Sequence, residues 1–91
     1  MSAPALSVVI PFHNEAANIA PLLAELRATL TTLGLADTAE IVCVDDGSRD
    51  TTAAELAAAA RTWPAVVVHT FPQNRGQAAA LWHGFHAARG E

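Results

Sequence analysis

The chain has 91 residues, a formal net charge of −4 at pH 7 and 52% hydrophobic residues, many of them alanine. This length is enough for one small domain, and the five scattered basic residues argue against a nucleic-acid-binding surface. No apolar run approaches the roughly 20 residues that span a bilayer. No basic segment followed by an apolar one begins the chain, so we expect a cytoplasmic protein without a membrane segment.

The first elements are a strand and a helix. An apolar strand is expected over residues 6–10, ending at Pro11 because proline has no N–H for a strand ladder. Apolar residues then recur at helical spacing over residues 19–33. Asn18 is the expected cap of this helix, and Gly34 is the expected residue at its end.

A second apolar strand is expected over residues 41–44. Its only sulfur is that of Cys43, which we interpret as a small core residue rather than a redox or metal-binding thiol. An alanine-rich helix then starts at Asp50 or Thr52 and ends before Pro64.

The last elements are a strand over residues 65–69 and a helix over residues 77–89. Leu81, Phe85 and Ala88 are expected on the core face of this helix, with Trp82 alongside. Strand and helix thus alternate three times, which predicts a parallel sheet with right-handed crossovers. By analogy with mononucleotide-binding halves, we expect a Rossmann-like, three-layer α/β/α domain over residues 1–91 with strand order 3-2-1.

Three polar loops follow the three strands, at residues 11–15, 45–50 and 72–76. Such loops share the carboxyl edge of a parallel sheet, where ligands bind. Carboxylates can accept an N–H from a base, and an arginine with backbone N–H groups at a helix start can meet phosphates. We expect Gly47 to take a positive φ and turn the second loop sharply. Taken alone, the Asp-Asp-Gly-Ser run is equally consistent with a simple polar turn.

Three segments resemble family 2 glycosyltransferases. They are residues 7–15 (SVVIPFHNE), residues 40–48 (EIVCVDDGS) with Asp50-Thr51-Thr52 behind, and residues 74–81 (NRGQAAAL). The third is similar to the branch that moves sugars onto polyprenyl or dolichyl phosphate. The resemblance extends from about residue 6 to residue 91.

The resemblance implies a GT-A type nucleotide-diphospho-sugar transferase fold and a UDP- or GDP-linked donor. In such enzymes an Asp-x-Asp motif holds Mg²⁺ or Mn²⁺, and this chain contains no such motif. The chain therefore resembles a donor-binding part that binds no metal, supplies no catalytic residue and is inactive alone. Carried over by position, the nucleotide-sugar-binding residues are Pro11, His13, Glu15, Asp45, Asp46, Arg75 and Gly76.

Within this set the resemblance implies different roles. Pro11, His13 and Glu15 would line the nucleoside pocket. Asp46, with Asp45 beside it, would hold the base and ribose, and the segment 75–76 would approach the diphosphate. His13 stands where the family often has an aromatic residue.

Other classes fit less well. A dinucleotide-binding domain needs Gly-x-Gly-x-x-Gly after the first strand, and a receiver domain needs its acid pair there; neither is present. A zinc site on His83 and His86 has no third ligand nearby. The rival hypothesis is a non-catalytic α/β fragment or nucleotide-binding module that mainly self-associates. Its homodimer would form through the free edge of the first strand.

Overall fold

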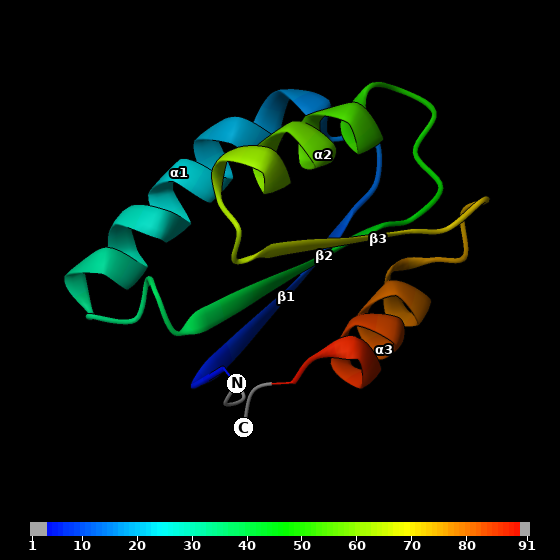
Figure 1. The fold of residues 1–91 in the computed structure, drawn as a ribbon. Coiled ribbons are helices and arrows are strands. Elements are labelled where there is room, and N and C mark those ends of the chain that lie inside the picture. Colours follow the sequence, from blue (N-terminus) through cyan, green and yellow to red (C-terminus); the bar gives the residue numbers. More distant parts are fainter. Residues whose placement is uncertain (1–3, 90–91) are drawn as a thin grey trace.

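The computed structural model describes residues 4–89. The three strands are parallel and lie in the order β1-β2-β3, which is the predicted order 3-2-1 viewed from the other side. Helices α1 and α2 cover one face of the sheet and α3 covers the other, so the predicted three-layer α/β/α architecture is confirmed (Figure 1). The elements are β1 Leu6–Phe12, α1 Ala16–Thr32, β2 Ala39–Asp45, α2 Thr52–Thr62, β3 Val66–Thr70 and α3 Gln77–Ala87.

The central strand β2 ends beside the ends of both neighbouring strands. All seven of its residues are buried. Its last residue, Asp45, pairs with Phe12 of β1 and with Thr70 of β3. The three loops after these strands therefore start side by side. Burial raises the pKa of Cys43 to about 12, which keeps the thiol neutral and confirms it as a core residue.

Several predicted boundaries differ from the structure by a few residues, and two of them have a clear local cause. Strand β1 continues through Pro11 to Phe12, because proline is tolerated on an edge strand. Helix α1 begins at Ala16, before the predicted cap Asn18, after Asn14 turns the chain with a φ of 52°.

The two faces of the sheet are packed very differently. On the α3 side the buried core consists of Val42, Val44 and Ala80. On the α1/α2 side it contains larger side chains and more of them: Phe12, Ile19, Leu23, Leu30, Ala39, Ile41, Cys43, Leu56, Trp63 and Val66.

The face that α3 turns to the sheet also differs from the prediction. Its buried residues are Ala80 and Gly84, whereas Phe85 is 63% exposed and Trp82 is 68% exposed. A Cβ added at Gly84 would collide with Val9, so this helix packs on the sheet through its smallest residues. Of the residues predicted on the core face, Ala88 packs against the core and Leu81 is half-buried, so the prediction was wrong for Phe85.

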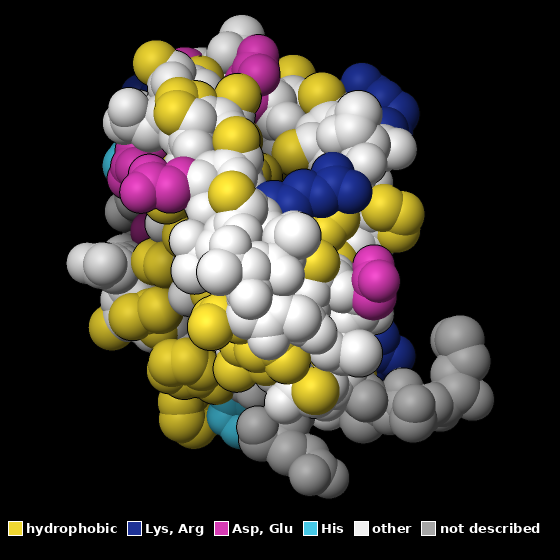
Figure 2. Space-filling model, turned by 90° about the vertical axis from the view of Figure 1, so that its left-hand side faces the viewer, with side chains coloured by type: hydrophobic (Ala, Val, Ile, Leu, Met, Phe, Trp, Pro, Cys, Tyr) yellow, Lys and Arg dark blue, Asp and Glu magenta, His cyan; other side chains and the backbone are white. Residues whose placement is uncertain are grey.

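The described surface is mixed in character. On the face in Figure 2, acidic and basic side chains are spread out, and hydrophobic side chains gather in its lower part next to a histidine. Within residues 4–89, no helix is long and apolar enough to cross a membrane.

Candidate functional site

A cavity of about 260 Å³ lies where the loops after the three strands meet. Small-molecule sites usually measure about 300–1,000 Å³, so this cavity can enclose only part of a nucleotide-sugar. Five of the seven predicted site residues line it. Its lining residues are Pro11, Phe12, His13, Glu15, Asp46, Asn74, Gly76 and Gln77.

Asp46 joins the second loop to the third. Its carboxylate is buried and accepts the backbone N–H of Arg75 at 2.7 Å and that of Gly76 at 2.9 Å. The side-chain amide of Asn74 donates a further hydrogen bond to it, at 3.1 Å. An ionised carboxylate has about four acceptor positions, so one remains for a donor on a ligand.

Asp45 has a different environment from its neighbour. Its side chain is buried at the end of β2, and its Oδ1 accepts the backbone N–H of Ser48 at 3.0 Å. This bond closes a turn at Gly47, whose φ is 64°, as predicted from the sequence. Backbone atoms of Gln73 occupy the space that a Cβ at Gly47 would need. The side chain of Asp45 thus stabilises the turn, whereas the side chain of Asp46 lines the cavity.

His13 is exposed, and its ring nitrogens contact both loops beside it. Its Nδ1 lies 2.9 Å from the carbonyl oxygen of Asp46, which can only accept, and 3.2 Å from the side-chain amide nitrogen of Asn74, so the shorter contact favours a hydrogen on Nδ1. Its Nε2 accepts from the amide of Asn14 at 3.3 Å. His13 and Asn74 also line a second cavity of about 460 Å³, so these two side chains lie between the two cavities.

The first loop is held by side chains near the start of α2. The backbone N–H of Asn14 donates to the hydroxyl of Ser48, and that of Glu15 to the hydroxyl of Thr52. Asp50 accepts the backbone N–H of Thr52 at 2.9 Å. The hydroxyl and the backbone N–H of Thr52 lower the pKa of Asp50. The loop that carries His13 is therefore anchored along its backbone.

Arg75 lies beside the cavity rather than in its wall. Its guanidinium carbon is 5.3 Å from the ring centroid of Phe71, and its backbone N–H is bound by Asp46. Gly76 has a φ of 95° and precedes α3 directly. Since Asp46 occupies the N–H groups of both residues, a phosphate would have to meet the Arg75 side chain or the first N–H groups of α3.

The acids of this site do not form a metal centre. Within the part of the chain that the structure describes, no group of three or more His, Cys, Asp or Glu residues could hold a metal ion. Asp45 is bound to a backbone N–H of its own loop, and Asp46 to two backbone N–H groups of the third loop. The residues present therefore do not fit the divalent cation that the sequence resemblance implies for an intact enzyme.

Three lining residues had not been predicted: Phe12, Asn74 and Gln77. Asn74 belongs to a motif that the sequence resemblance had already marked, and its position two residues before Gly76 was the available signal. Phe12 is mostly a core residue, and only the extension of β1 past Pro11 brings it to the cavity.

A parallel α/β sheet with a carboxylate-lined cavity at its carboxyl edge is typical of a nucleotide-binding domain. Residues 7–91 match the model of Glycosyl transferase family 2. The chain belongs to this family.

Two curated relatives carry transferase names. An undecaprenyl-phosphate 4-deoxy-4-formamido-L-arabinose transferase of Pseudomonas aeruginosa is 48% identical over 87 residues, which are 94% of this chain and 25% of the relative. An uncharacterized glycosyltransferase of Synechocystis is 38% identical over 93% of this chain and 26% of its own length. The chain thus spans about a quarter of the curated relatives that it matches.

Two solved structures share the fold. The mannosyltransferase PcManGT of Pyrobaculum calidifontis, solved with GDP-Man and Mn²⁺, matches with a TM-score of 0.71 and 28% identity. That match covers 97% of this chain and 25% of the mannosyltransferase chain. TarS of S. aureus matches with a TM-score of 0.76 and 25% identity, over 94% of this chain and 25% of TarS. These neighbours are GT-A glycosyltransferases, which confirms the expected fold.

Proposed function

We propose that this chain forms the donor-binding part of a glycosyltransferase that moves a sugar from a UDP- or GDP-linked donor to a polyprenyl phosphate. The main support for this proposal is the buried carboxylate of Asp46, which lines the cavity and has one hydrogen-bond acceptor position left. An imino N–H of a base is a suitable donor for it, and such a charge-assisted bond contributes about 1.5–3 kcal/mol.

His13 and Glu15 line the same cavity from the loop after β1. With its proton on Nδ1, His13 offers the Nε2 lone pair on its other side, where a ligand hydroxyl could replace Asn14 as donor. The nucleoside would lie between this loop and Asp46, and the diphosphate would extend toward Arg75 and the start of α3.

The names of the relatives support the donor and acceptor classes. The mannosyltransferase neighbour was solved with GDP-Man, and the Pseudomonas relative is named for undecaprenyl phosphate. A lipid-linked acceptor would bring the intact enzyme to a membrane surface, with this domain in the cytoplasm. Mg²⁺ or Mn²⁺ would be bound in the intact enzyme by residues other than those described here.

Titration of the ¹⁵N-labelled chain with UDP and GDP tests donor binding. We expect amide shifts at residues 12–15, 45–48 and 74–77, and none in the segment between α1 and β2. If neither nucleotide moves these amides at millimolar concentration, the proposal fails.

The chain alone should not transfer sugar, with or without added Mn²⁺. Asp45 and Asp46 are bound to backbone N–H groups, and within residues 4–89 no group of three or more acidic, His or Cys side chains could hold a metal against a diphosphate. Incubation with nucleotide-sugars and a polyprenyl phosphate, followed by product detection, checks this. Formation of a glycosylated lipid would contradict it.

A second candidate function is self-association. Among the described strands β1 lies at one end of the sheet and pairs with β2, and edge strands are where second copies of a chain add to a sheet. We expect a symmetric dimer through this edge. Light scattering at NMR concentrations measures the mass, and a strictly monomeric mass would overturn the dimer.

A further inference from the structure

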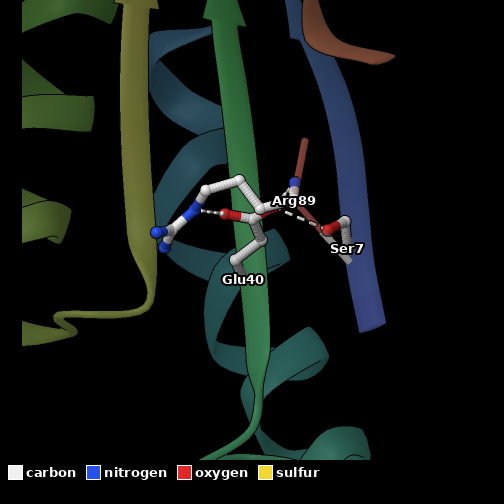
Figure 3. A network of polar contacts seen from close by, with 3 residues as sticks. All are labelled: Ser7, Glu40 and Arg89. Carbon is white, nitrogen blue, oxygen red and sulfur yellow. Dashed lines mark hydrogen bonds and ion pairs between the residues drawn. The ribbon is translucent and has the colours of Figure 1, made fainter. Parts of the chain in front are cut away.

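Glu40 is a buried acid on the α3 side of β2, far along the strand from the candidate site. Its carboxylate accepts the hydroxyl of Ser7 at 2.6 Å and the backbone N–H of Arg89. The Nε of Arg89 lies 3.5 Å from its other oxygen. Figure 3 shows Glu40 reaching from the central strand to Ser7 on β1 and to Arg89 in the segment after α3.

The charge of Glu40 is stabilised by these partners. Burial raises its pKa, but the hydrogen bonds from Arg89 and Ser7 together with the Arg89 guanidinium outweigh burial, so the pKa lies below its ordinary value. Glu40 is therefore ionised at neutral pH. The proposed donor site does not use this carboxylate.

Helix α3 is thus bound by a carboxylate at each end. Asp46 binds the N–H groups of Arg75 and Gly76 before the helix, and Glu40 binds Arg89 after it. Asp46 comes six positions after Glu40 along the chain, about 20 Å at about 3.3 Å per residue of strand. The helix and its flanking residues from Gly76 to Arg89 span a similar length at about 1.5 Å per residue.

Between these two ends the helix contacts the sheet mainly through small residues. Ala80 and Gly84 are buried, and Ala87 and Ala88 pack against the same small core cluster, whereas the aromatic side chains of Trp82 and Phe85 are mostly exposed. One larger contact is that of His83 with His69 on β3, whose ring nitrogens lie 3.1 Å apart. Contacts between small side chains resist tilting of a helix less than large interlocking ones, so the bonds at its two ends contribute to its direction.

We propose that Glu40 is a positioning residue for the donor site, acting through α3. By binding Arg89 it fixes the far end of the helix, and this holds Gly76 and Gln77 in place in the wall of the cavity. The expected effect on nucleotide binding rests on the proposed function, because α3 supplies a part of the cavity wall that a nucleotide would contact. The effect on the helix itself does not depend on a nucleotide.

The test compares Glu40→Gln with Ile41→Val. Ile41 is the next residue of β2 and is buried on the opposite face, so its shortening mildly destabilises the domain without touching α3. Amide hydrogen exchange at Arg75 and Gly76 is the main readout, and nucleotide affinity is the second. Arg89→Ala leaves the backbone N–H in place and is the milder variant if Glu40→Gln fails to fold.

We expect Glu40→Gln to speed exchange at Arg75 and Gly76 by about tenfold or more, and Arg89→Ala by less, relative to Ile41→Val. Nucleotide affinity should fall in the same order. If the Glu40 and Arg89 variants exchange no faster at these amides than Ile41→Val, the residue is only structural and the inference is overturned. If no nucleotide binds the unaltered chain, the proposed function fails, and the exchange rates still decide this inference.

Discussion

The two faces of the sheet are built on different principles. The α1/α2 face buries large side chains such as Ile19, Leu23 and Leu56. The α3 face buries Val42, Val44 and Ala80, and its helix is bound at both ends by the carboxylates of Asp46 and Glu40. Apolar burial is non-directional, whereas a carboxylate bound to defined N–H groups fixes a position. The first face therefore supplies stability, and the second controls the geometry of the cavity wall.

The largest effect is expected on the α1/α2 face. Leu56 is the one large apolar side chain of α2 and is fully buried. Leu56→Ala should lower the free energy of unfolding by about 2–5 kcal/mol. Phe85→Ala on α3 is the matched control, with an expected change of about 0.5 kcal/mol because this ring is mostly exposed. Urea unfolding measures both, and equal losses would contradict the contrast between the faces.

A smaller effect is expected where α3 touches the sheet. Gly84→Ala would place a methyl group against Val9 and Val44, and such overpacking costs about 1–3 kcal/mol. In an unconstrained helix the same change would stabilise by about 1 kcal/mol. The sign of the change in urea unfolding therefore decides whether α3 lies as close to the sheet as described.

The smallest effect is expected in the pH dependence of the free energy of unfolding. Since the pKa of Glu40 is lower in the folded protein, its contribution is present above its ordinary value of 4.5 and is lost as the pH falls through the folded value. The stability difference between the unaltered chain and Glu40→Gln should be constant near neutral pH and shrink below 4.5. Urea midpoints from pH 7 to pH 3 measure it, with the exposed Glu25→Gln as control for net charge. A difference that grows on acidification would contradict this.

The sequence predicted the order of elements and the strand order, because apolar runs and polar loops alternate with a regular spacing. It predicted most of the cavity wall for the same reason, since loops after parallel strands meet at one edge. It predicted the buried face of α3 only in part. Large residues such as Phe85 follow the helical period, and only the close approach of Gly84 to Val9 selects the other face.

The contacts of α3 with the two carboxylates could not be predicted from the sequence either. Asp46 and Gly76 are thirty residues apart, and Glu40 and Arg89 are separated by 49. No local pattern indicates that a carboxylate will bind backbone N–H groups at such a distance along the chain. The resemblance marked Asp46 as a ligand-binding residue, and the structure adds that it also anchors the third loop.

The most direct test of the account compares Asp46→Asn with Asp45→Asn in nucleotide binding, with the exposed Asp37→Asn as control. Asp46 lines the cavity and has an acceptor position left, whereas Asp45 lies beneath the turn. Calorimetric titration with UDP or GDP should show a loss of about 1.5–3 kcal/mol for Asp46→Asn, a smaller loss for Asp45→Asn and none for Asp37→Asn. Equal losses for the two neighbouring acids, or a larger loss for Asp45→Asn, would contradict the assignment of Asp46 as the residue that holds the base.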